Sequence, residues 1–234
     1  MCYDRRAFPG GIILLRRLSL CILITTHIWI AAPLRACELA LVLAVDVSAS
    51  ISSGEYALQM QGLADALDDP VIVHALVKGQ TALTLVQWSG VSEQDVSIPW
   101  QRILTQQDVA EFARTTEELR RKWRNGFTAI GSMLDFAAPL YLAVPDCRRL
   151  VLDVSGDGII NAGVPTRAVR DLLIAKGVTI NGIAIDRKGD TVNQYFRSDI
   201  IGGADAFVIP TRGYADYVLS IREKLFRELI DPVS

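Results

Sequence analysis

The strongest constraint on the fold is a continuous aliphatic run, Leu39–Val45, that ends at Asp46. An apolar run of this length without polar alternation predicts a strand that is buried on both faces, as in parallel sheets covered by helices. Ser52 and Glu55 follow at the spacing of a capping box, and apolar residues then recur at helical intervals up to Leu67. The chain therefore opens with a strand, a loop and a helix.

The remaining sequence repeats this alternation, and Pro99 marks one short segment as an edge strand. The pattern predicts a doubly wound α/β fold with a mostly parallel sheet, one short antiparallel edge strand and helices on both faces. In such sheets the ligand site lies at the carboxyl ends of the strands, where the strand order changes direction. We expect further strands at 82–88, 96–100, 150–154, 178–185 and 206–209, and helices at 105–121, 128–141, 165–175 and 214–229.

The N-terminal segment has the features of a targeting sequence. Two arginines precede an apolar run at 18–30, and small residues lead to a cleavage site after Ala36. We expect residues 1–36 to be a signal peptide and 37–234 to form one α/β domain in the periplasm or outside the cell. Two alternatives stay open: an uncleaved anchor, although the apolar segment is short for a membrane span, and a lipoprotein attached through Cys37.

Composition limits the kinds of partner. Half of the 234 residues are hydrophobic and 21% are charged, which excludes disordered, coiled-coil and collagen-like chains. The predicted signal peptide removes five arginines and one aspartate, which leaves 19 basic and 25 acidic residues and a net charge of −6. An acidic domain is attracted neither to nucleic acid nor to an anionic membrane surface. We therefore expect no nucleic-acid partner and no stable membrane span after cleavage.

The residue inventory excludes several kinds of active site. After export the chain keeps one histidine, His74, in an apolar stretch where a packing role is commoner than a catalytic one. A zinc site built from several His and Cys ligands is thereby excluded, and a Ser-His-Asp triad would depend on this histidine. A phosphate-binding loop, a dinucleotide fingerprint and a G-x-S-x-G elbow are also missing from the sequence. We expect a binding protein and not an enzyme.

The ends of the predicted strands offer oxygen ligands. Each of these residues alone is ordinarily a helix cap or a turn residue. Jointly, two carboxylates and three hydroxyls suit a hard cation, Mg²⁺ or Mn²⁺, that also keeps bound waters. The five residues are Asp46, Ser48 and Ser50 after the first strand, Thr128 at a predicted helix start, and Asp157 within Ser-Gly-Asp-Gly after the strand at 150–154.

In their order and spacing, these residues resemble the metal-ion-dependent adhesion site of von Willebrand factor type A domains. The resemblance covers the mature chain from Cys37 to about Ile230, and its further motifs are similar to those of a bacterial branch of secreted type A domains. It implies that the three hydroxyls contact the metal directly and that Asp46 and Asp157 bind it directly or through water. A carboxylate of a partner protein would complete the coordination. One departure is the Ser-Gly pair before Asp157, where better-known members carry a threonine next to the acid.

Two further features follow from this arrangement. Trp123 and Phe127 precede Thr128 and are the aromatic residues expected on the partner-binding rim, although core packing is the commoner use of such rings.

Cys37 lies nine residues before one acid, and Cys147 lies ten residues before the other. If both acids end neighbouring parallel strands, the cysteines meet at the opposite edge, where a disulfide would stabilise the fold by roughly 4 to 5 kcal/mol in the chain-entropy model.

Three functions remain open at this point. The first is a secreted, metal-dependent protein-binding module of the adhesion type. The second is a structural domain whose metal only stabilises the fold. The third is a metal-dependent phosphohydrolase, since a cation at the switch point of an α/β sheet is also enzyme architecture.

Overall fold

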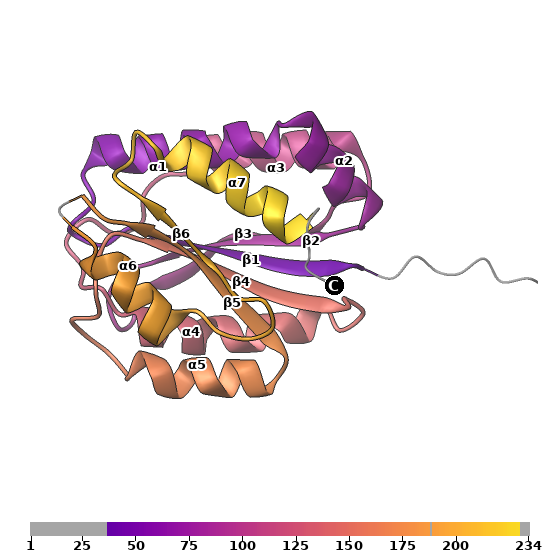
Figure 1. The fold of residues 1–234 in the computed structure, drawn as a ribbon. Coiled ribbons are helices and arrows are strands. Elements are labelled where there is room, and N and C mark those ends of the chain that lie inside the picture. Colours follow the sequence, from indigo (N-terminus) through magenta and orange to yellow (C-terminus); the bar gives the residue numbers. More distant parts are fainter. Residues whose placement is uncertain (1–36, 188, 230–234) are drawn as a thin grey trace, which may run out of the picture. The chain divides into compact units, whose positions relative to one another are not determined.

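In the computed structural model, which describes residues 37–187 and 189–229, six strands form one sheet in the order β3-β2-β1-β4-β5-β6. β3 runs antiparallel to β2, and the other neighbouring pairs are parallel. The predicted doubly wound, mostly parallel sheet is therefore confirmed (Figure 1). The strands are β1 (Leu39–Asp46), β2 (Ala82–Trp88), β3 (Gln94–Arg102), β4 (Arg149–Gly156), β5 (Val178–Ile185) and β6 (Val208–Thr211).

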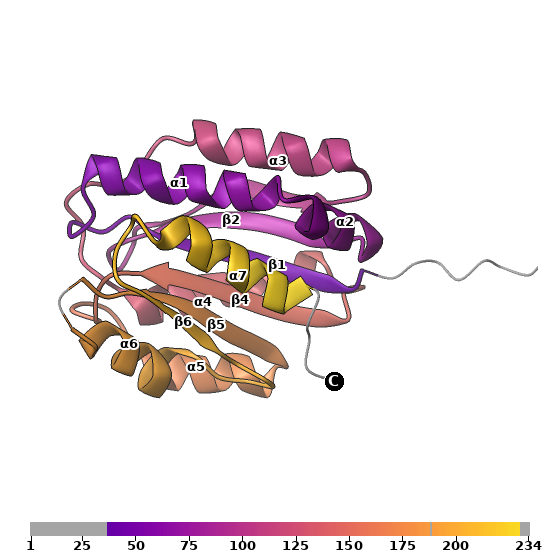
Figure 2. The same ribbon diagram turned by 45° about the horizontal axis from the view of Figure 1, so that its top comes forward.

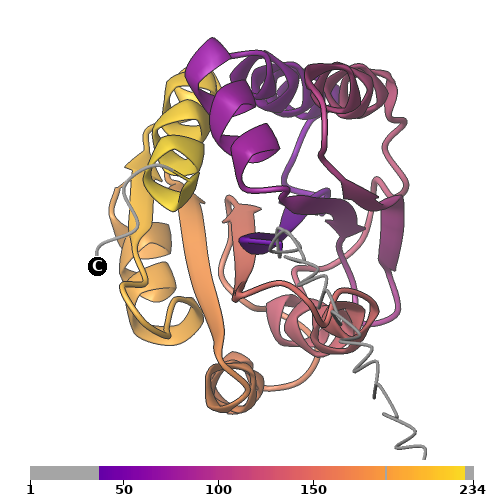
Figure 3. The ribbon, with the colours of Figure 1, turned by 90° about the vertical axis from the view of Figure 1, so that its right-hand side faces the viewer.

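Helices cover both faces of this sheet (Figures 1 and 3). α1, α2, α3 and α7 lie on one face, and α4, α5 and α6 lie on the other. Figure 2 shows α1 between α3 and α7. The helices are α1 (Ser53–Leu67), α2 (Pro70–Lys78), α3 (Gln106–Glu118), α4 (Ile130–Ala137), α5 (Thr166–Ala175), α6 (Thr191–Tyr195) and α7 (Tyr217–Leu229), with a 3₁₀ turn at Ala138–Ala143 and a π-helical turn at Phe196–Ile200.

The continuous aliphatic run of β1 is explained by its place in the middle of the sheet, where all eight residues are buried. Leu41 and Leu43 belong to the core beneath α1, together with Met60. Val42 and Ala44 face the opposite way, into the core beneath α4. Because alternate side chains of a strand point to opposite faces, β1 supplies both cores and carries no solvent-facing position.

Local sequence signals explain where several helices begin. The capping box of α1 is confirmed: the Glu55 backbone N–H donates to Ser52 Oγ at 3.3 Å, and the Ser52 N–H donates to Glu55 Oε2 at 2.8 Å. α2 is a helix that the sequence analysis did not identify. Asp69 caps it by accepting from Val71 N at 2.9 Å, and Pro70 occupies its first turn.

Other boundaries differ from the predicted ones in ways that the side chains explain. β3 spans nine residues and is longer than the expected edge strand, and Pro99 is tolerated because β3 pairs on one side only. α4 changes to a 3₁₀ turn at Ala138–Ala143, because Pro139 has no N–H for the α-helical hydrogen bond. The short helical segment at 191–200 between β5 and β6 was not predicted.

The order of the strands places a switch point between β1 and β4, because the chain moves from β1 to β2 in one direction and from β4 to β5 in the other. The carboxyl ends of the parallel strands lie on the left in Figure 1. At the opposite edge, Cys37 and Cys147 form a disulfide. The predicted signal peptide lies outside the described residues, and none of the helices described between residues 37 and 229 is long and apolar enough to cross a membrane.

Candidate metal centre

Asp46 ends β1 at the switch point, and the residue has no exposed surface. Its Oδ1 accepts a hydrogen bond from the backbone N–H of Ser48 at 2.7 Å. Its Oδ2 is buried and has no hydrogen-bond partner among the described residues. A buried carboxylate oxygen without a donor costs free energy, so this atom needs a positively charged or donating ligand.

Three hydroxyls converge beside this carboxylate. Ser48 Oγ and Ser50 Oγ are 3.2 Å apart, and Thr128 Oγ1 lies 3.5 Å from Ser48 Oγ. Ser50 Oγ donates to Asp157 Oδ1 at 2.5 Å. The structure thus brings together the five residues that the sequence analysis selected, from the ends of β1 and β4 and the start of the α4 segment.

The backbone around the centre is fixed by residues that the sequence analysis did not select. The Arg121 guanidinium donates from Nη2 to the carbonyl oxygens of Val47 and Ser48 at 3.0 and 2.7 Å, which holds the loop after β1. Asn161 Oδ1 accepts from the backbone N–H of Thr128 at 2.8 Å, and its own N–H donates back to the Thr128 carbonyl at 3.1 Å. α4 begins at Ile130, two residues after Thr128, so Thr128 is not at the helix start that the sequence predicted. Asn161, and not a helix cap, holds its backbone.

Burial sets the charge state of the two acids. Desolvation raises the pKa of Asp46 to about 7, although hydrogen bonds from Ser48 act in the opposite direction. Desolvation also raises the pKa of Asp157, against the lowering effects of the Ser50 hydroxyl and the nearby Arg187. Both carboxylates are thus costly to keep ionised in the metal-free protein, and a bound cation would offset that cost.

The donor set fits a hard divalent cation. It consists of two carboxylates and three hydroxyls, all of them oxygen ligands of the kind preferred by Mg²⁺ and Mn²⁺. Within the described part of the chain, no group of three or more His, Cys, Asp or Glu side chains comes together as a metal site. A cation here would therefore depend on Ser48, Ser50 and Thr128 as much as on the acids.

The two aromatic residues expected on the rim occupy different environments. Phe127 is 64% exposed beside Thr128. Trp123 is half-buried and packs against the core beneath α1 and α3. Ile159, two residues after Asp157, is about half exposed. The exposed apolar surface near the centre thus comes from Phe127 and Ile159, while Trp123 serves the core.

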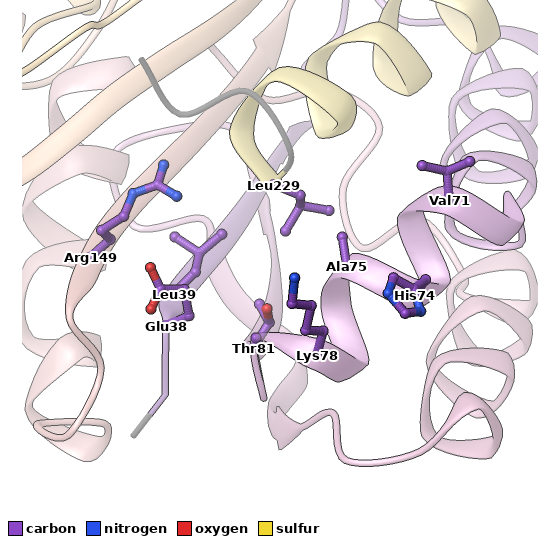
Figure 4. A pocket seen from close by; sticks show the side chains of 10 residues that line it. Glu38, Leu39, Val71, His74, Ala75, Lys78, Thr81, Arg149 and Leu229 are labelled. Atoms are coloured by element: carbon purple, nitrogen blue, oxygen red, sulfur yellow. The ribbon is translucent and has the colours of Figure 1, made fainter. Parts of the chain in front are cut away.

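The surroundings of His74 are separate from this centre. His74 is exposed on α2 and lines a cavity of about 670 Å³ together with Lys78 and Arg149 (Figure 4). The cavity includes Leu39 and Arg149, the first residues of β1 and β4, so it lies at the amino ends of the strands. The histidine and the candidate metal ligands are therefore at opposite edges of the sheet.

Several solved structures share this fold. Proximal thread matrix protein 1 from the mussel byssus matches with a TM-score of 0.64 and 18% identity over 81% of this chain and 48% of that protein, and another structure of it has a zinc-occupied MIDAS motif. A von Willebrand factor type A structure from Catenulispora acidiphila matches with a TM-score of 0.62 and 17% identity, over 83% of this chain and 43% of that one. The pilus adhesin SpaC from Lactobacillus rhamnosus GG matches with a TM-score of 0.61 and 11% identity, over 82% and 31%.

These similarities establish the fold, and this chain spans less than half of each of those proteins. No curated protein matches the chain. Residues 36–233 match the family described as "Protein of unknown function (DUF1194)". The chain belongs to the DUF1194 family, and its described residues have the fold of a von Willebrand factor type A domain.

Proposed function

We propose that this protein is a secreted or periplasmic, metal-dependent binding module of the adhesion type. Asp46, Ser48, Ser50, Thr128 and Asp157 would hold a divalent cation, Mg²⁺ or Mn²⁺, either directly or through water. The cation would leave one coordination position for a carboxylate of a partner protein. Binding, and not turnover of a substrate, would be the function of the site.

The observation that carries this proposal is the Oδ2 atom of Asp46, which no hydrogen-bond donor of the described residues contacts. It is buried at the carboxyl edge of the sheet, beside Gly156 at the end of β4. Buried polar atoms in folded proteins are nearly always satisfied, and an oxygen that faces other oxygen atoms is satisfied by a cation. The zinc-occupied motif of the mussel protein supports a divalent metal at this position of the fold.

Charge favours an acidic group of the partner as the ligand. The mature chain is predicted to carry a net charge of −6, so an acidic protein would be repelled over most of its surface. A divalent cation offsets the charge of the two carboxylates, and because the other ligands are neutral hydroxyls it can still accept a further carboxylate. Specific attraction of a carboxylate would therefore be confined to the metal.

The rim would add affinity without touching the metal. Phe127 and Ile159 flank the centre with exposed apolar side chains. Interface energy is concentrated in such central apolar and aromatic residues. We propose Phe127 as the anchor for the partner, while the packing of Trp123 in the core makes its contribution indirect.

The disulfide supports an oxidising compartment. Cys37 and Cys147 are bonded at the start of β1 and before β4, and such bonds persist in secreted and periplasmic proteins. Because the sulfur of Cys37 is engaged in this bond, a lipid anchor on the same sulfur would require its loss. We therefore propose export with cleavage after Ala36 in preference to lipid anchoring.

The proposal is tested by affinity capture from the native extract with three immobilised proteins. Wild type with MgCl₂ should retain a partner that is lost in EDTA and lost with Thr128→Ala. Thr115→Ala, a matched change on the exposed side of α3, should retain it. A partner retained equally in EDTA would contradict the mechanism. Magnesium-dependent stabilisation without any magnesium-dependent partner would favour the structural-metal alternative, and cleavage of generic phosphate esters would favour the phosphohydrolase.

A further inference from the structure

Arg187 bridges three segments around the candidate metal centre. It follows β5 by two residues, and its Nη2 donates to Asp157 Oδ2 at 2.8 Å. Its Nη1 donates to Glu55 Oε1 at 2.5 Å, and Nη2 also donates to the Ser50 carbonyl at 3.4 Å. The ring of Tyr214 lies 6.0 Å from the guanidinium. One arginine thus joins the loop after β1, the first turn of α1 and the end of β4.

This bridge shields the carboxylate of Asp157 from solvent. The side chain of Asp157 has no exposed surface, while that of Arg187 is 42% exposed above it. The two oxygens of the carboxylate are both engaged: Oδ1 accepts from Ser50 Oγ, and Oδ2 accepts from Arg187. A cation that binds this acid must therefore share or displace one of these two donors.

The two donors differ in their ability to share. A serine hydroxyl has one hydrogen and two lone pairs, so Ser50 can donate to Asp157 and still offer a lone pair to a metal. A guanidinium has no lone pair to offer and stays positively charged, so Arg187 repels a cation and cannot coordinate it. Of the two, Arg187 is the group that a divalent cation would displace.

We propose that Arg187 is an internal counter-ion that competes with the divalent cation for Asp157 and thereby lowers the metal affinity of the site. The inference rests on the proposed function, because it assumes a cation at the same centre. Glu55 makes it feasible for a cation to replace Arg187 at Asp157. Its carboxylate already holds the other end of the guanidinium and is 21% exposed, so Arg187 keeps a partner after it releases Asp157.

Calorimetric titration with MgCl₂ tests this competition. Arg187→Gln removes the positive charge and should lower the dissociation constant for Mg²⁺ about tenfold, since an adjacent opposite charge typically changes the proton affinity of a carboxylate by one to three orders of magnitude. Arg187→Lys keeps the charge and should stay within about threefold of wild type. Arg124→Gln is the matched control: Arg124 is an exposed arginine on the same rim that donates to Ser53 Oγ at 3.1 Å.

Thermal unfolding in EDTA separates competition from a structural role. Arg187→Gln loses two ion pairs, so its melting temperature in EDTA should fall, while its affinity for Mg²⁺ rises. A residue that only braces Asp157 would lower both. An unchanged or weaker affinity in Arg187→Gln, or an equal gain in Arg124→Gln, would overturn the proposal.

The outcomes also separate this inference from the proposed function. If wild type and Arg187→Gln bind Mg²⁺ equally, the role of Arg187 is wrong and the metal site stands. Binding by Arg187→Gln with none by wild type supports the competition. If neither protein binds Mg²⁺ or Mn²⁺, the competition and the metal site are both wrong.

Discussion

Gly156 lies against the carboxylate of Asp46, so close that a Cβ at position 156 would sit 3.1 Å from Asp46 Oδ2. The same Cβ would meet the ring of Trp88 at 3.5 Å. The φ angle of Gly156 is not in the left-handed region, so the backbone alone does not require glycine there. The requirement is space beside Asp46 Oδ2.

Gly156→Ala therefore has a predictable effect on the metal centre. The added methyl group crowds Asp46 Oδ2 and should weaken Mg²⁺ binding, while the melting temperature in EDTA falls by only a few degrees, as for other small overpacking changes. Titration of the melting temperature with MgCl₂ measures both. Gly54→Ala is the control, because an added Cβ there meets open space. Gly177→Ala is not used, because Gly177 has a positive φ. A wild-type magnesium response in Gly156→Ala would contradict the crowding argument.

Substitution of the two aromatic residues should separate stability from binding. Trp123→Ala removes a side chain that packs against the core and should destabilise the fold by about 1–3 kcal/mol, less than a fully buried aromatic residue because it is half-buried. Phe127→Ala removes a mostly exposed ring and should leave urea unfolding unchanged within about 0.5 kcal/mol. In the capture experiment Phe127→Ala should weaken partner retention without changing the magnesium-dependent melting shift. Strong destabilisation by Phe127→Ala would argue against its place on the rim.

A buried charge cluster beneath α7 predicts a pH dependence. Lys224 lies 2.7 Å from Asp153 Oδ1 and 2.6 Å from Glu228 Oε1, and Asn181 Nδ2 donates to the same glutamate oxygen at 3.0 Å. Burial raises the pKa of Tyr217 on α7, and the charge of Asp153 raises it further. Desolvation raises the pKa of Asp153 to about 7, although the nearby Lys224 lowers it.

The direction in which the free energy of unfolding changes with pH follows from which state binds the proton. Between about pH 4 and pH 7 the folded state holds a proton on Asp153 that the unfolded state has lost, so the free energy of unfolding decreases as the pH rises through this window. From pH 5.5 to 7.5 the decrease due to this group should be about 1–2 kcal/mol. Asp153→Asn should remove that part of the slope in urea unfolding with EDTA present. Equal slopes in wild type and variant would show that Asp153 does not bind the proton.

The disulfide supplies a prediction that is independent of the metal. Cys37 and Cys147 close a loop with a sequence separation of 110. In the chain-entropy model their bond stabilises the fold by roughly 4 to 5 kcal/mol. The double variant Cys37→Ser, Cys147→Ser should therefore unfold at much lower urea concentration, and wild type in a reducing agent should behave in the same way. Two free thiols in the oxidised protein by mass spectrometry would contradict the bond itself.

The sequence predicted those parts of the fold that depend on local pattern. The aliphatic run of β1 and the capping box at Ser52 identified a central strand and the helix after it, because burial on two faces and helix capping leave direct marks in the sequence. α2 was not identified although Asp69 and Pro70 carry its start signal, because its apolar residues resemble a buried run. The segment at 191–200 was also missed, since it is held by packing of Phe196 and Ile200 on the sheet.

For the site, spacing was sufficient for the ligands but not for their supports. Asp46, Ser48 and Ser50 share one loop, so their convergence can be predicted from three consecutive alternate positions. Arg121 and Arg187 contact that loop and Asp157 across long stretches of chain, and no local pattern marks an arginine whose partner is 30 or more residues away. Such long-range contacts require the folded structure.

The most direct test of the account is the stoichiometry of metal binding. Equilibrium dialysis against MnCl₂ should give one bound Mn²⁺ per chain in wild type, displaced by excess MgCl₂, and none in Asp46→Asn. Because Asp46→Asn keeps the shape of the side chain and removes a buried charge, it should fold at least as stably as wild type in EDTA, so a loss of binding reports on the site. No bound Mn²⁺ in wild type, or equal binding by Asp46→Asn, would contradict a metal centre at Asp46.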